Sequence, residues 1–147
     1  MTITRYLEDD HRRMERFLNN DYPQFRGALL RHIGMEEKIL FPAIRGVPGL
    51  EQLHLDHGAL AALLVPTPTP EILNAIRSIL ERHNLLEEGP NGIYRQIEKL
   101  ATPEDASRIL AKLQSAPPVA MNPHVDNATA MASMHAALAR AGYSFNL

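Results

Sequence analysis

The chain has no cysteine among its 147 residues, and it has no tryptophan. Without cysteine it cannot form a disulfide, bind an iron–sulfur cluster through thiolates, or build a zinc site from sulfur ligands. It also lacks an excess of positive charge, since 15 basic and 17 acidic residues leave a formal net charge of −2. This balance gives no electrostatic reason to expect nucleic acid or an anionic membrane as a partner.

Long apolar stretches are missing as well, and no segment approaches the roughly 20 apolar residues needed to span a bilayer. The first residues, Met1-Thr2-Ile3-Thr4-Arg5, lead into a charged amphipathic pattern rather than a signal peptide. We therefore expect a cytoplasmic protein with no membrane partner. The length is sufficient for one domain with a full hydrophobic core.

Histidine, by contrast, is well represented, with seven residues, and most of them fall in a repeated pattern. The segments 31–37 (RHIGMEE) and 82–88 (RHNLLEE) share the form RHxxxEE. An Asp-His pair precedes each copy, Asp10-His11 before the first and Asp56-His57 before the second. The chain therefore contains a twofold internal repeat whose invariant residues are potential metal ligands or their neighbours.

Apolar residues follow a helical spacing in four long segments, at about residues 4–18, 23–40, 48–64 and 70–88. Shorter helical patterns follow at about 93–100, 103–113 and 126–141, and no segment alternates as a strand would. We predict an all-α protein, an antiparallel up-and-down four-helix bundle with additional C-terminal helices. The bundle would occupy residues 1–100, and residues 101–147 would form a helical extension packed on the same domain.

Three residues have the type and position of helix N-caps: Asp21, Thr69 and Thr102. Each precedes a proline within the next two residues, where the first turn of a helix tolerates it. The chain should therefore begin new helices at these three points. We expect the second long helix to be stopped by Phe41-Pro42 and the glycine-rich turn that follows.

The repeat places histidine and glutamate one helical turn apart, as His32 with Glu36 and as His83 with Glu87. Side chains at i and i+4 share a helix face, so each pair can bind one centre. His11 and His57 would add one imidazole from each of the other two helices. Inward-facing side chains at one level of a bundle converge on one core site.

Four imidazoles and two carboxylates suit two divalent ions, with the glutamates free to bridge them. These ligands fit iron, manganese or zinc, and the absence of sulfur argues against copper(I). A single histidine on an apolar face is usually a core residue, and one HxxxE pair occurs by chance in many helices. Two pairs in the same heptapeptide frame, each preceded by Asp-His, favour a metal site.

The order H…HxxxE…H…HxxxE resembles the hemerythrin-like domains, also called HHE cation-binding domains, over about residues 4–100. The resemblance identifies His11 and His57 with the single histidines of the first and third helices. It implies an up-and-down bundle around an oxo- or hydroxo-bridged di-iron centre, with Glu36 and Glu87 bridging the ions. Manganese or zinc are alternative metals.

One position departs from the oxygen-carrying hemerythrins, which have a further histidine four residues after the ligand of the third helix. Ala61 stands at that position. His54, three residues before His57, is either a seventh ligand or a residue at the rim of the site. If His54 does not bind, both ions would keep exchangeable positions, which favours reactivity over reversible oxygen carriage.

A ferritin-like di-iron site is the rival interpretation, because Glu8 with His11 and Glu51 with His54 are ExxH pairs. That assignment leaves three inward histidines unexplained. It also places the ExxH pairs on the first and third helices rather than on the second and fourth.

Acidic residues beside the ligands receive weaker assignments. Asp10 and Asp56 are either carboxylates that orient ligating imidazoles or surface acids. Glu37 and Glu88 lie off the ligand face and should be solvated.

Other residues with polar rings are not expected to bind metal. His124 and His135 lie in the C-terminal region without a paired carboxylate. Tyr6 and Tyr94 could approach the site, although a tyrosine in a bundle core more often serves packing.

The predicted function is binding or sensing of dioxygen or iron by a di-iron centre. The alternative is a di-iron oxidoreductase acting on peroxide or nitric oxide, or a protein that donates iron in repair. A zinc or manganese protein with a structural or regulatory role is a third possibility. No flavin site or electron-transfer domain is evident, which favours a binding protein with dioxygen or another small diatomic molecule or peroxide as its ligand. The C-terminal tail is a candidate surface for a homodimer.

Overall fold

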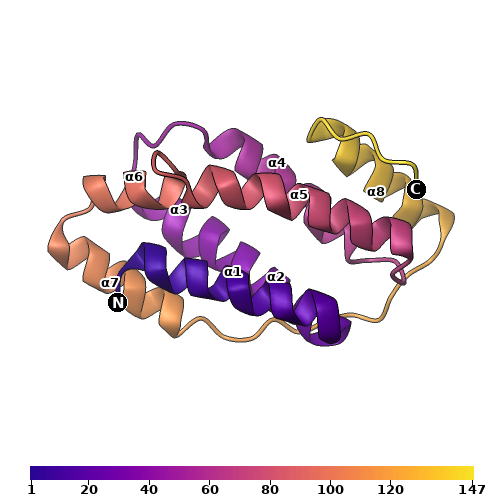
Figure 1. The fold of residues 1–147 in the computed structure, drawn as a ribbon, viewed down its shortest axis with the longest axis horizontal. Helices are drawn as coiled ribbons and strands as arrows, with labels where there is room; N and C mark the ends of the chain where they lie inside the picture. Colours follow the sequence, from indigo (N-terminus) through magenta and orange to yellow (C-terminus); the bar gives the residue numbers. More distant parts are fainter. The chain divides into compact units, whose positions relative to one another are not determined.

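The computed structural model describes residues 1–147 and contains helices but no strand (Figure 1). The prediction of an all-α protein is therefore confirmed. No helix has the length and apolar character that crossing a membrane requires. In chain order the elements are α1 Ile3–Asn20, α2 Tyr22–Met35, the π-helix η1 Glu36–Leu40, α3 Phe41–Ala43, α4 Leu50–Leu63, α5 Pro70–Glu88, α6 Ile93–Leu100, α7 Pro103–Gln114 and α8 Ala128–Arg140.

The three predicted N-caps are confirmed by their hydrogen bonds. Asp21 Oδ1 accepts from the Gln24 N–H at 3.3 Å. Thr69 and Thr102 accept through their hydroxyls from the N–H groups three residues on, at 3.2 and 3.1 Å. These bonds satisfy N–H groups that a helix start leaves without an intrahelical partner, which fixes where α2, α5 and α7 begin.

The second long helix differs from a regular α-helix from Glu36 onward, the glutamate of the first HxxxE pair. At η1 the backbone widens into a π-turn, and the Phe41 N–H bonds to the Glu36 carbonyl five residues back. The helical path then continues through Pro42 to Ala43, slightly beyond the predicted end. A proline has no N–H, and in an α-helix its ring clashes with the carbonyl four residues back. The wider π-turn relieves that clash, so the chain passes Pro42 without breaking.

The contacts divide the chain into two compact units. The first unit contains Met1–Pro48 and Leu85–Met121. Within it α1 packs against α2, α6 and α7, and α7 also contacts η1. The apolar residues buried in this unit form its core, and they include Leu7, Met14, Phe25, Leu29, Met35, Leu40 and Ile97.

The second unit contains Gly49–Asn84 and Asn122–Leu147. Here α4 packs against α8, and the buried apolar residues include Leu53, Leu60, Leu63, Ile76, Met134 and Leu138. The proline-rich connector is tied to the segment before α8, because Asp126 accepts from the Thr67 N–H at 2.8 Å and from its hydroxyl at 2.7 Å. This pairing holds two stretches of irregular backbone together.

The arginine of each RHxxxEE copy contacts the C-terminal extension within its own unit. Arg31 donates to the Leu113 carbonyl at 3.2 Å and to the Ala116 carbonyl at 2.9 Å, at the end of α7. The guanidinium of Arg82 lies 5.3 Å from the ring centroid of Tyr143, just after α8. The predicted extension is thus divided by its contacts, with α7 in the first unit and α8 in the second.

Candidate metal centre

The six principal ligand candidates are all buried, and none has more than 4% of its surface exposed. We group them by unit. The first ligand cluster consists of His11 on α1, His32 on α2, Glu36 on η1 and Glu87 on α5, and the second ligand cluster consists of His57 on α4 and His83 on α5.

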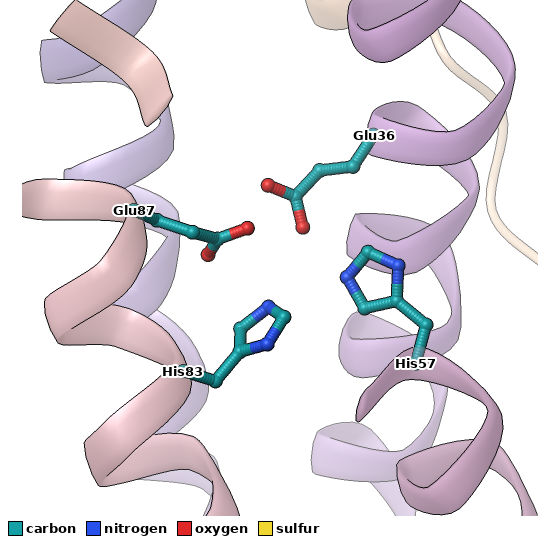
Figure 2. Close-up of side chains that lie close together, drawn as sticks. All are labelled: Glu36, His57, His83 and Glu87. Carbon is teal, nitrogen blue, oxygen red and sulfur yellow. The ribbon is translucent and has the colours of Figure 1, made fainter. Parts of the chain in front are cut away.

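In the first ligand cluster the donor atoms converge. His11 Nε2 lies 3.1 Å from His32 Nε2 and 3.1 Å from Glu87 Oε1. His32 Nε2 lies 3.4 Å from Glu36 Oε1, across one turn of helix. Figure 2 shows the carboxylates of Glu36 and Glu87 pointing toward each other. His11, His32 and Glu87 place one ligand atom each within 4.8 Å of one another, so this buried cluster can hold a metal ion.

The orientation of His32 is set by a buried aspartate. His32 Nδ1 lies 2.7 Å from Asp10 Oδ2. With Nδ1–H donating to Asp10, Nε2 is left as the ligand atom that faces the carboxylates. Arg13 in turn donates to Asp10 Oδ1 from Nε at 3.1 Å and from Nη2 at 3.0 Å.

The hydroxyl of Tyr94 lies among the donor atoms of the first ligand cluster. Its distances are 2.8 Å to Glu36 Oε2, 2.9 Å to Glu87 Oε1, 3.0 Å to His11 Nε2 and 3.3 Å to His32 Nε2. The side chain is fully buried. Tyr94 therefore approaches the site, as the sequence allowed, and does more than fill the core.

Protonation in the first ligand cluster reflects burial among carboxylates. Burial lowers the pKa of His32, but Glu36, Asp10 and Glu87 outweigh it and raise that pKa to about 10. For His11 burial also lowers the pKa, and Glu87 and Glu88 raise it by more. In the metal-free protein the protonated imidazole of His32 therefore supplies positive charge that the buried carboxylates require. A bound cation supplies the same charge, so the donor set fits a metal ion.

For Tyr94, burial raises the pKa rather than lowering it, because the charged form of a phenol is the anion. Burial and the nearby carboxylates of Glu36 and Glu87 hold its pKa well above the usual value. Without a metal ion the phenol is therefore neutral.

Glu88 lies within the first unit's polar network, so the prediction that it is solvated is wrong. Its side chain is 13% exposed, and Oε2 lies 3.1 Å from His11 Nδ1. Oε1 pairs with Arg12 Nη2 at 2.5 Å. Burial raises the pKa of Glu88, but His11 and Arg12 more than offset this and lower it. Because successive helix residues lie about 100° apart, Glu88 leaves the ligand face yet reaches α1.

The second ligand cluster consists of two imidazoles. The ring centroids of His57 and His83 are 4.9 Å apart, with an angle of 51° between the planes. Figure 2 shows the two rings directed toward each other. His83 Nδ1 lies 3.0 Å from Asp56 Oδ2, which again leaves Nε2 as the ligand atom.

Asp56 is itself held by two neutral donors. The Gln52 amide and the Tyr143 hydroxyl each donate to Oδ1 at 2.8 Å. Gln52 also donates to the Ala141 carbonyl at 3.0 Å, next to the end of α8. Burial raises the pKa of Asp56, while His83, Tyr143 and Gln52 lower it by more.

Asp10 and Asp56 are both buried and both orient imidazoles, which decides between the two assignments that the sequence left open. Neither bonds to the adjacent histidine in these pairs. Each bonds to the histidine of the RHxxxEE copy that follows it, Asp10 to His32 and Asp56 to His83. The repeated Asp-His element therefore contributes one ligand candidate and one residue that orients another ligand candidate.

The remaining sequence candidates lie elsewhere. His54 is exposed on α4, which gives no support to the prediction of a seventh ligand. His124 and His135 are exposed as well. Of the ferritin-like alternative, Glu51 is exposed and Glu8 is half-buried, 3.7 Å from Arg95.

Tyr6, the other tyrosine considered, contacts different groups. Its hydroxyl donates to the Leu113 carbonyl at 3.4 Å and lies 3.4 Å from Arg31 Nη2. This hydroxyl therefore supports the packing of α7 in the first unit.

Comparisons of the chain with protein-family models, with curated proteins and with solved structures gave no match. The resemblance to hemerythrin-like domains therefore rests on the spacing of the motif alone.

Proposed function

We propose that this protein is a non-haem di-iron protein of hemerythrin-like type that binds or senses dioxygen or iron. In this proposal the four main helices form an antiparallel bundle, and two iron ions share six ligands: His11, His32, Glu36, His57, His83 and Glu87. Glu36 and Glu87 are the bridging carboxylates.

The observation that carries the proposal is the pair of buried Asp–His hydrogen bonds. Asp10 with His32 and Asp56 with His83 use the same nitrogen, Nδ1, and the same carboxylate oxygen, Oδ2. A carboxylate on the far nitrogen of a ligating histidine fixes its tautomer and raises its basicity, and such partners accompany most metal-bound histidines. A single buried Asp–His pair could serve packing alone. The same pair recurs at the same position of both repeat copies, and this recurrence favours metal ligation.

Helix α5 gives further support for two ions. It is continuous from Pro70 to Glu88 and carries His83 and Glu87 one turn apart. Residues at i and i+4 have Cβ atoms about 5–6 Å apart. Metal ions in two-metal sites lie about 3.5–4 Å apart. One helix can therefore place a ligand on each of two neighbouring ions.

When bound, iron(II) supplies the electrons that dioxygen requires for strong binding. The protein's own residues control access and protons. The first unit buries Leu7, Met14 and Met35, which exclude water from the interior. Exclusion of water limits proton entry and side reactions. The contact of His32 Nδ1 with Asp10 holds the imidazole, and therefore its donor nitrogen Nε2, in a fixed orientation.

Metal content and optical spectra test this proposal directly. The full chain, loaded anaerobically with iron(II) and desalted, should retain about two ions per chain. On exposure to oxygen it should develop charge-transfer bands in the near-ultraviolet and visible regions. Reversal of those bands under vacuum supports oxygen binding, whereas irreversible oxidation favours the oxidoreductase.

Two variants serve as a matched pair in that experiment. His32→Ala removes a buried ligand and should lower the retained iron and the band intensity. His54→Ala removes an exposed histidine on α4 and should change neither. Retention of neither iron nor manganese by the wild-type protein would exclude the di-metal function.

A further inference from the structure

We propose that Tyr94 is itself a metal ligand, whose phenol oxygen binds the ion held by the first ligand cluster. This inference rests on the proposed function, because it requires that the cluster binds metal. Neither the repeat nor the HxxxE spacing assigns a role to this residue, which lies in α6 outside both copies.

The backbone is built to bring Tyr94 back to the cluster. After α5 ends at Glu88, the chain turns within four residues and α6 begins at Ile93. The Gly92 N–H bonds to the Gly89 carbonyl at 2.7 Å and closes this turn. A Cβ atom on Gly92 would lie only 2.4 Å from the Glu87 carbonyl oxygen, so no larger residue fits there without a backbone shift. The glycine therefore allows Tyr94, in the first turn of α6, to reach the side chain of Glu87.

The distances around the hydroxyl match those between neighbouring ligands of one ion. Two donors at right angles, each about 2.1 Å from a metal ion, are about 3 Å apart. Tyr94 Oη lies between 2.8 and 3.3 Å from one donor atom of each of the four cluster residues. This spacing is the one expected between donor atoms that would share one ion. His11 Nε2 has the same 3.1 Å spacing from His32 Nε2 and from Glu87 Oε1.

Hydrogen bonding alone does not account for this arrangement. A phenol has one proton to donate. Glu36 Oε2 and Glu87 Oε1 both accept only, and they lie 2.8 and 2.9 Å from the hydroxyl. One of these two contacts therefore brings oxygen lone pairs together at short range in a fully buried place. A cation among the donors turns that repulsion into shared coordination.

Coordination has a defined balance. The O–H bond of Tyr94 breaks, a metal–oxygen bond forms, and the proton leaves to solvent, with no change in oxidation state. The bound group is then a phenolate. Phenolate bound to iron(III) produces a visible charge-transfer band, and excitation in that band enhances the ring vibrations of the phenolate in the Raman spectrum.

The test uses the full chain loaded with iron and oxidised to iron(III). We expect the wild-type protein to show the visible band and phenolate ring vibrations on resonance excitation. Tyr94→Phe should lose both signals and hold iron at least about tenfold more weakly, the lower limit for loss of a group that supports metal binding. Tyr6→Phe is the matched control, because its hydroxyl bonds to the Leu113 carbonyl and not to the cluster. This control should keep both signals.

The outcomes separate the two proposals. A wild-type protein that retains no iron contradicts the proposed function itself. A wild-type protein that retains iron(III) without phenolate vibrations overturns the role of Tyr94 as a ligand and leaves the di-iron function intact. Persistence of those vibrations in Tyr94→Phe would also overturn it. Because the wild-type Raman spectrum decides the question, the test holds even where the variant does not fold.

Discussion

The two Asp–His pairs use the same contact but anchor it with different chemistry. Asp10 orients His32, and its other oxygen is bound by the cation of Arg13, three residues along the same helix. Asp56 orients His83, and its other oxygen accepts from Gln52 and from Tyr143, which lies 87 residues away. Where the first copy has Arg13, the second has Ala59.

This difference shows that the repeat extends to the candidate ligands and their orienting carboxylates but not to the groups beyond them. A cation beside Asp10 offsets part of its charge and weakens its pull on the His32 proton. Neutral donors leave the charge of Asp56 intact. We therefore expect His83 to be the more electron-rich imidazole, and any two ions bound by this protein to be chemically distinct.

The largest effect should follow removal of an orienting carboxylate. Asp10→Asn and Asp56→Asn each replace an acceptor of the histidine Nδ1–H, and each should lower metal affinity by about 10–100-fold. Competition with a coloured chelator measures the affinity. Asp9→Asn is the control, since that exposed residue pairs only with Arg5. An unchanged affinity in both buried variants would show that the Asp–His pairs serve packing alone.

The next effect concerns pH in the metal-free protein. His32 has a pKa raised from 6.5 to about 10 by the carboxylates around it. A raised pKa means that the folded state holds the proton more tightly than the unfolded state. The stabilisation is fully present below about pH 6.5 and is lost as the pH rises toward 10. Urea midpoints in chelator should therefore be lower at pH 9.5 than at pH 6.

Metal loading provides the control for that pH series. A bound ion replaces the protons in the first ligand cluster, so the loaded protein should lose less stability over the same range. An equal loss with and without metal would mean that groups outside the cluster cause it.

Loss of the Tyr143 hydroxyl should have a smaller effect. Tyr143→Phe keeps the ring that lies near Arg82 but removes one hydrogen bond to Asp56. A hydrogen bond to a charged group stabilises by about 1.5–3 kcal/mol, and we expect the lower value here because Tyr143 is only half-buried. Denaturant unfolding of the wild-type protein and of Tyr143→Phe measures this difference in unfolding free energy. Tyr6→Phe loses two long contacts of 3.4 Å, to the Leu113 carbonyl and from Arg31 Nη2, and should cost less, about 0.5–1 kcal/mol.

The smallest effect is expected at Arg13. Arg13→Met removes the cation beside Asp10, but the Arg13 side chain is 43% exposed, and such pairs contribute about 0–1 kcal/mol. The change in unfolding free energy should therefore be smaller than for Tyr143→Phe. A larger change at Arg13 would reverse the comparison and make the first pair the more dependent on its outer partner.

Much of the helical layout was predictable from short-range signals. The caps at Asp21, Thr69 and Thr102 act within three residues, and the proline-rich connector excludes helix by its own chemistry. The burial of the six ligand candidates also follows from helical periodicity. The π-turn after Glu36 was not predictable, because it depends on how the helix adjusts to Pro42.

The outer parts of the candidate metal centre could not be predicted, because they depend on long-range packing. Asp56 and Tyr143 meet across 87 residues with no motif to link them. Tyr94 was seen only as a residue that could approach the site, since its reach depends on the turn at Gly92. Glu88 was assigned to solvent because periodicity within one helix does not reveal its neighbours. In the structure α1 lies beside Glu88 and supplies His11 and Arg12 as its partners.

The contact between Asp56 and Tyr143 also has a consequence during synthesis. Ribosomes add about 5–20 residues per second, so Tyr143 emerges on the order of ten seconds after Asp56. His83 follows Asp56 by 27 residues and is made well before Tyr143, so for most of that interval the Asp56–His83 pair lacks the hydroxyl that completes its network. We expect the first Asp–His pair, whose outer partner Arg13 is made almost at once, to mature early in translation. The second pair should reach its final strength only when the chain beyond α8 has left the ribosome.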